Sequence, residues 1–87
     1  PDLVPRLRRA ALGAVLDLPP PERDTLLATV RAVLDADGSP SHAATALYCH
    51  RNTVMYRLAR LETLTGRRLA DPRDRLLLGL ALVAPAP

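Results

Sequence analysis

The sequence predicts an all-α fold, a five-helix bundle without a β-strand or a winged element. Phe and Trp are absent and only two tyrosines are present, so the core must be built from Leu, Val and Ala. Leu and Ala are strong helix formers, whereas residues typical of strands are sparse. Apolar residues recur at helical spacing, and no stretch alternates as a half-buried strand would. At 87 residues, the chain is expected to form one domain, residues 1–87, with a small core.

The leading segment, residues 1–18, is predicted to form one helix from about Leu3 to Leu16. Its apolar residues keep helical spacing as far as Leu18. The three prolines that follow, residues 19–21, then end this helix.

The support segment, residues 21–37, is predicted to form the second helix. Pro21 lies in its first turn, where the missing N–H has no partner to lose. The apolar residues form one stripe, which consists of Leu26, Leu27, Val30, Val33 and Leu34. Gly38 is expected to end the helix in the left-handed conformation.

Residues 41–65 are predicted to form a short helix, a tight turn and a longer helix. The short helix is expected over His42–Tyr48, with either Ser39 or Ser41 as its N-cap. The turn contains Cys49 and His50. The longer helix is expected over Arg51–Thr65 and ends at a glycine.

The C-terminal segment, residues 71–84, carries a strong helix start signal. Asp71 is suited to the N-cap and Pro72 to the first helical position, so a last helix is predicted from about Pro72 to Val83. The AlaProAlaPro tail is expected to fray. Leucines and Val83 occupy more than one face of this helix. We therefore expect the excess to be covered by the first helix or to form a dimer interface.

The segment 41–65 has the arrangement of a helix-turn-helix. A helix of about eight residues, a tight turn and a second amphipathic helix are its defining parts. Ala43 and Ala44 are small, as a close crossing of two helices requires, and Val54 and Leu58 are expected to face back towards them. In such a motif the start of the longer helix, here Arg51–Thr65, enters the DNA major groove.

Positive charge gathers on the longer helix of this motif and on the residues that directly follow it. Residues 17–37 hold five acids and two arginines, a sum of −3, whereas residues 50–68 hold five arginines and one acid, a sum of +4. This asymmetry within a chain of net charge +3 favours an anionic partner for residues 50–68.

Polar residues of that helix are candidate DNA contacts. Arg51 can read guanine O6 and N7, and Asn52 can read adenine N6 and N7, both with two hydrogen bonds. Tyr56 is suited to a base edge, a thymine methyl group or a phosphate, and packing is its structural alternative. The full candidate set is His50, Arg51, Asn52, Thr53, Tyr56, Arg57 and Arg60.

The remaining members of the set are suited to the DNA backbone. Thr53, Arg57 and Arg60 match phosphate oxygens. Arg57 has a structural alternative, an ion pair with Glu62 or with an acid of the helix predicted over residues 21–37. His50 is expected to be a helix N-cap or a phosphate contact. Met55 has no assigned role.

Several other classes of function are disfavoured. No nucleophile–base or carboxylate pair has useful spacing, so we expect no enzyme, no catalytic residue and no cofactor. One cysteine and two histidines are too few for a zinc site. Cys49 is read as a small apolar turn residue, and the single cysteine fits a reducing, cytoplasmic setting. The apolar run over residues 76–84 is nine residues long, short of the roughly 20 that a membrane span needs.

The segment also resembles a known family. The patterns HRNTV-x-YRL-x-R-L and E-x-LTGR-x-L-x-DP, followed by a leucine-rich helix, are similar to the C-terminal helix-turn-helix domain of PucR and sugar-diacid (CdaR) type bacterial regulators. The resemblance covers roughly Leu26 to Val83. Cys49 stands where a Val-like residue is usual, and Met55 stands where a polar or basic residue is common. The resemblance implies the DNA-binding end of a longer regulator with an N-terminal sensor, which agrees with a chain that begins with proline.

The expected function is therefore sequence-specific binding of double-stranded DNA through the major groove. A homodimer is expected, because two half-sites about 34 Å apart compensate for the few base contacts of one motif. RNA polymerase is a further candidate partner. The alternative is a helical protein-interaction or dimerisation module without direct DNA readout. The operator, the effector and the sign of regulation do not follow from the sequence.

Overall fold

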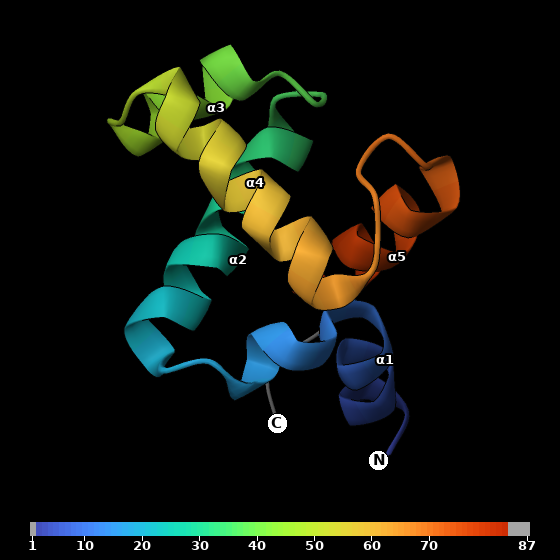
Figure 1. The fold of residues 1–87 in the computed structure, drawn as a ribbon. Helices are drawn as coiled ribbons and strands as arrows, with labels where there is room; N and C mark the ends of the chain where they lie inside the picture. The colour runs from blue at the N-terminus through green and yellow to red at the C-terminus, as the bar shows by residue number, and fades with distance from the viewer. Residues whose placement is uncertain (1, 84–87) are drawn as a thin grey trace.

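The computed structural model describes residues 2–83 and is all-α over that range, as predicted (Figure 1). Five α-helices and one 3-10 helix follow one another without a strand among these residues. They are α1 (Leu3–Leu12), η1 (Gly13–Asp17), α2 (Pro20–Asp35), α3 (Pro40–Leu47), α4 (Arg51–Thr65) and α5 (Pro72–Val83). The predicted fraying of the AlaProAlaPro tail concerns residues outside the described range.

The leading segment differs from the prediction of one helix to Leu16. α1 ends at Leu12, and a 3-10 helix continues from Gly13 to Asp17. The cause is Gly13, which has φ +51° and whose N–H donates to the carbonyl of Arg9. Glycine adopts this left-handed backbone readily, and the change in geometry cannot be read from apolar spacing.

The end of α2 also differs from the prediction. The helix runs from Pro20 to Asp35, and the first left-handed residue after it is Asp37, with φ +53°, not Gly38. Gly38 follows with φ +85° and donates its N–H to the carbonyl of Val33 at 2.8 Å. Asp37 donates to the carbonyl of Leu34 at 3.2 Å. These two bonds form a Schellman motif in which the aspartate occupies the position that usually holds glycine.

The ends of α3 and α4 are set by local capping. Ser39 is the N-cap of α3, because its Oγ accepts the N–H of His42 at 3.2 Å. α3 therefore begins at Pro40, two residues before the predicted start, and Pro40 fills the first helical position. α4 begins and ends at the predicted residues, and Gly66 follows it with φ +71°.

Two clusters of buried apolar residues form the core. The larger joins α1, η1, α2, α4 and α5 and consists of Ala11, Leu12, Val15, Leu26, Val30, Leu61, Leu78, Ala81 and Leu82. The smaller lies between α2, α3 and α4 and consists of Val33, Ala43, Ala44, Val54 and Leu58. α4 contributes to both clusters and crosses the molecule between α3 at one end and α1 at the other (Figure 1).

Polar contacts hold both ends of α5. Asp71 is the predicted N-cap, with Oδ1 accepting the N–H of Arg73 at 2.8 Å. At the other end, Arg8 donates to the carbonyl of Ala81 at 2.8 Å and Arg31 donates to that of Leu82 at 3.0 Å. Cations at this end are favourable, because the last carbonyls of a helix carry partial negative charge.

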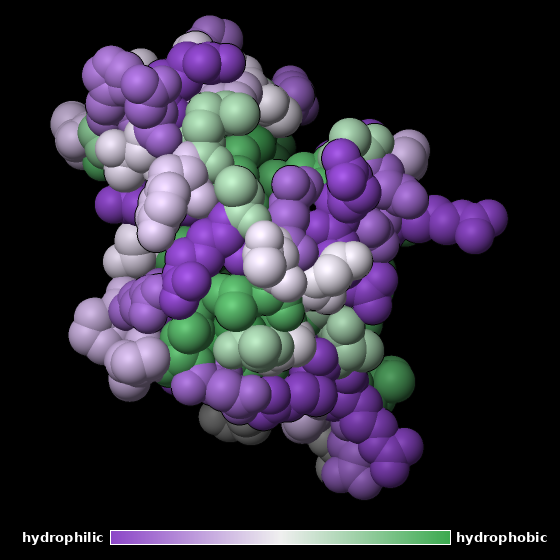
Figure 2. All heavy atoms as spheres, in the orientation of Figure 1, coloured by the Kyte–Doolittle hydropathy of each residue, from purple (hydrophilic) through white to green (hydrophobic). Residues whose placement is uncertain are grey.

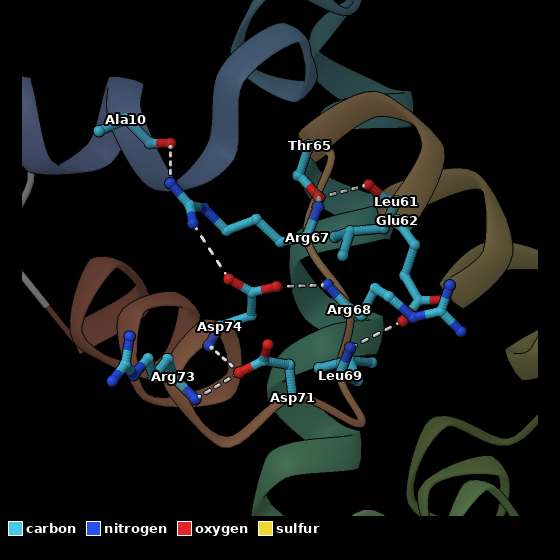
Figure 3. Close-up of polar contacts among 10 residues, drawn as sticks. All are labelled: Ala10, Leu61, Glu62, Thr65, Arg67, Arg68, Leu69, Asp71, Arg73 and Asp74. Carbon is cyan, nitrogen blue, oxygen red and sulfur yellow. Dashed lines mark hydrogen bonds and ion pairs between the residues drawn. The ribbon is translucent and has the colours of Figure 1, made fainter.

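The loop between α4 and α5 is tied down by a polar network (Figure 3). Arg67 bonds the carbonyl of Ala10 at 3.0 Å and Oδ1 of Asp74 at 3.1 Å. The N–H of Arg68 donates to Oδ2 of Asp74 at 2.9 Å, and this bond, with the Arg67 guanidinium, holds the pKa of Asp74 below its ordinary value. Glu62 accepts the N–H of Leu69 at 2.7 Å. The network therefore connects the end of α4 to α1 and α5.

Candidate nucleic-acid interface

α3 and α4 cross closely, as the small residues of α3 predicted. Ala43 is fully buried and Ala44 is 5% exposed, and both lie in the same cluster as Val54 of α4, which is also fully buried. Side chains larger than methyl at the two alanine positions would force the helices apart. The crossing therefore fixes the direction in which the start of α4 leaves the domain.

A histidine caps the N-terminus of α4. The Nδ1 atom of His50 accepts the N–H of Asn52 at 3.0 Å, so His50 is an N-cap, one of the two predicted roles. This bond requires the tautomer with an unprotonated Nδ1. Arg51 and Asn52 follow the cap and both are exposed, which leaves their side chains at the tip of the helix.

One face of α4 points away from the domain. Four exposed residues recur at spacings of three and four, which places them on the same side of the helix. We call this surface the outer face; it consists of Asn52, Met55, Tyr56 and Ala59. Tyr56 is 69% exposed, so the structural alternative of a packed tyrosine does not apply in this chain. Thr53 lies half-buried beside this face.

The structure separates Arg57 and Arg60 from the outer face, because both side chains project towards α2. Arg60 places Nη2 at 2.6 Å and Nε at 2.7 Å from Oε1 of Glu22. Arg57 donates from Nη1 to the hydroxyl of Thr29 at 3.5 Å. The suggested Arg57–Glu62 pair is not among the contacts of the described residues; an acid of α2 is instead paired with Arg60.

Sequence reasoning missed one residue of the turn. Tyr48 was expected inside the third helix, but it ends α3 in the left-handed conformation, with φ +56°. Its side chain is 97% exposed. Left-handed backbone is unfavourable for residues other than glycine, so local pattern gives no signal for a tyrosine here.

The surface over this end of the molecule is polar. Figure 2 shows hydrophilic side chains gathered over α3 and the start of α4. Within the described range, no group of three His, Cys, Asp or Glu side chains is arranged to hold a metal ion. None of the described helices has the length and apolar character needed to cross a membrane.

A short helix, a three-residue turn and a second helix with an exposed polar start define this chain as a helix-turn-helix domain. The chain belongs to the family of the PucR C-terminal helix-turn-helix domain, whose model matches residues 26–84. The resemblance seen in the sequence is thereby confirmed. The match begins at Leu26 within α2, so α1, η1 and the first turns of α2 lie outside it.

Relatives of this chain include two proteins that are named as regulators. It is 44% identical over 61 residues to the purine catabolism regulatory protein of Bacillus subtilis, covering 70% of this chain and 12% of that protein. It is 51% identical over 43 residues to the carbohydrate diacid regulator of Escherichia coli, covering 49% of this chain and 11% of that protein. An uncharacterised Thermomonospora curvata protein is 43% identical over 58 residues, with 67% and 32% covered. The chain thus spans a small part of each relative. No solved structure matches it significantly.

Proposed function

We propose that this chain binds double-stranded DNA sequence-specifically, as the DNA-binding domain of a PucR-type transcription regulator. The observation that carries the proposal is the start of α4, where exposed Arg51 and Asn52 follow a capped helix end that the buried α3–α4 crossing holds in place. This is the geometry with which a helix-turn-helix enters the major groove. The domain acts by binding and does no chemistry.

The outer face and the tip of α4 would supply sequence readout. Arg51 pairs with guanine and Asn52 with adenine, each through two hydrogen bonds in the major groove. Tyr56 lies one turn after Asn52 and reaches a base edge or a phosphate. Ala59 is small and exposed, so it lets the helix lie deep in the groove.

The backbone contacts would come from residues at the borders of α4. His50 offers its Nε2 atom and Thr53 its hydroxyl to phosphate oxygens. Arg60 is 38% exposed and uses only Nε and Nη2 for Glu22, so Nη1 can donate to a phosphate without breaking that pair. The Arg57–Thr29 bond is at the long limit for a hydrogen bond and is easily exchanged for a charged acceptor.

In the intact regulator we propose a homodimer on two half-sites, in the cytoplasm and on the nucleoid, with a separate sensor part. Contact with RNA polymerase is a further part of this proposal. An exposed apolar row on α5 supports an association surface: Leu76 is 65%, Leu80 is 47% and Val83 is 78% exposed. The same row supports the alternative function, a protein-interaction module that does not read DNA.

The first experiment measures binding of the chain to a random-sequence duplex pool at 50 mM and at 200 mM salt. Affinity should fall steeply with salt, because phosphate contacts release counterions. Arg60→Ala should reduce the slope of log affinity against log salt by about one. Arg6→Ala is the matched control, since Arg6 is an exposed arginine of α1, at the other end of the molecule from α3 (Figure 1).

A second experiment separates readout from charge. Sequences are selected from the pool with the unmodified chain and with Asn52→Ala. The variant should lose preference at one base pair, at a cost of about 1–3 kcal/mol on the selected site. If the chain does not bind the duplex pool at low salt, the proposal that it binds DNA is wrong. If the chain then self-associates through α5, the interaction module takes its place.

A further inference from the structure

Met55 occupies the outer face of α4 without a structural task. Its side chain is 42% exposed, and it belongs to neither cluster of the core. It lies three residues after Asn52, next to Tyr56, and four residues before Ala59, so it shares the surface that carries the proposed readers.

Several other side chains in the middle and second half of α4 have visible roles within the domain. Val54, Leu58 and Leu61 anchor the helix in the core. Arg57 and Arg60 contact α2, and Glu62 holds the loop after α4. Since these contacts fix the helix without Met55, this side chain is available to an external partner.

We propose that Met55 contacts the 5-methyl group of a thymine and so determines specificity at one base pair; this inference rests on the proposed function. The thymine methyl is the one apolar group that a base pair presents in the major groove. The unbranched methionine side chain is polarisable and flexible, so it can follow a methyl group over several helix orientations. It offers no strong donor or acceptor to the other base edges.

Helix geometry places this contact beside the one proposed for Asn52. Three residues correspond to about 4.5 Å along the helix axis. The rise between base pairs is about 3.4 Å. The two side chains therefore address neighbouring base pairs, and Ala59 one turn further on leaves room for the DNA to approach. A thymine should accordingly lie next to the adenine that Asn52 reads, on either strand.

The test removes the methyl group from the DNA. A duplex selected with the unmodified chain is remade with each thymine in turn replaced by deoxyuridine, and the Kd is measured for each. One replacement should weaken binding about three- to five-fold, as expected for the loss of one buried methyl group. Met55→Ala should weaken binding to the thymine duplex by a similar factor and should lose the response to deoxyuridine at that position. Met55→Leu should retain the response.

Two controls make the outcome specific. Leu3→Ala also truncates an exposed apolar side chain, 78% exposed and on α1, and it should respond to deoxyuridine as the unmodified chain does. Circular dichroism and thermal unfolding should show that Met55→Ala folds normally, since the residue lies outside the core clusters. Met55→Arg should move the preference at the same base pair towards guanine.

The results separate this inference from the function on which it rests. Sequence-selective binding that is indifferent to every thymine methyl overturns the role of Met55 and leaves the proposed function standing. An equal response to deoxyuridine in the unmodified chain and in Met55→Ala has the same meaning. Failure to bind or to select any duplex overturns both.

Discussion

Arg60 holds Glu22 across 38 positions of the sequence, with Nε and Nη2 of the guanidinium both within 2.7 Å of a single carboxylate oxygen. The pair joins the middle of α4 to the first turn of α2. Glu22 lies at the positive end of the α2 dipole, where a carboxylate is favourable. The same arginine is a proposed phosphate contact, so Glu22 competes with DNA for its charge.

Replacing Glu22 with Gln should therefore strengthen DNA binding and barely affect folding. We expect about two- to three-fold tighter binding at low salt, because one negative charge near the phosphates is removed, and a smaller gain at high salt. The free energy of unfolding should change by less than about 1 kcal/mol, since both partners are roughly 40% exposed. Asp35→Asn removes an exposed acid of α2 outside this pair and is the control. Weaker DNA binding by Glu22→Gln would show that the pair positions α4 instead of restraining Arg60.

The Asp74 network predicts a pH dependence of stability. Because the N–H of Arg68 and the guanidinium of Arg67 lower the folded pKa of Asp74 below 3.8, its contribution is complete above that pH. It is lost as the pH falls from 3.8 through the lowered value. Asp74→Asn should lower the Tm at pH 7, and the difference from the unmodified chain should shrink as the pH falls below 3.8. A difference that grows on acidification would contradict this sign.

Two leucines that differ in burial give a matched test of the core. Leu61 is 1% exposed and lies in the larger cluster, whereas Leu76 is 65% exposed. Leu61→Ala should lower the free energy of unfolding by about 2–5 kcal/mol, because it opens a cavity. Leu76→Ala should change it by less than about 0.5 kcal/mol. Urea unfolding of dilute protein measures both, and similar losses would place Leu76 in a buried interface.

Substitution of each of the two tyrosines with glycine should change the free energy of unfolding in opposite directions. Tyr48 has left-handed backbone and a 97% exposed side chain, so Tyr48→Gly should raise the free energy of unfolding by up to about 1 kcal/mol. Tyr56 lies inside α4, so Tyr56→Gly should lower it by about 0.5–1 kcal/mol. Thermal unfolding of the two variants checks the pair. Destabilisation by Tyr48→Gly would mean that the phenol ring makes a contact the fold needs.

Helix boundaries with a chemical signal were predictable from the sequence. Asp71-Pro72 starts α5 and Gly66 follows the end of α4, because a side-chain acceptor, a fixed φ and a missing Cβ act within a few residues. Gly13 was not recognised as a boundary, since a lone glycine in an apolar helical pattern does not reveal its φ. The position of Asp37 in the Schellman motif was hidden because residues other than glycine rarely adopt positive φ, so the neighbouring Gly38 was the expected left-handed residue.

The residues of the outer face could be predicted from the sequence, whereas the contacts of Arg57 and Arg60 with α2 could not. Helical spacing alone places Asn52 and Tyr56 opposite Val54, and the structure agrees with that placement. Arg57 and Arg60 have long side chains that reach away from their own Cα positions, and their partners on α2 lie 28 and 38 positions earlier. Such pairs depend on how the helices pack, which a helical wheel does not contain.

The turns on either side of α3 each hold a residue other than glycine at positive φ, Asp37 at +53° and Tyr48 at +56°. Each such residue raises the free energy of the folded turn by about 1–2 kcal/mol. Local unfolding of α3 releases the backbone strain at both positions. The helix has eight residues, and of these Ala43 and Ala44 are the buried ones, so little apolar surface opposes the opening. Amide hydrogens of α3 should therefore exchange with solvent faster than those of α4, through local unfolding that leaves the larger core intact. α3, the half of the motif that supports α4, is then the first part of the domain to unfold locally. Bound DNA that stabilises α3 should slow the amide hydrogen exchange of this helix.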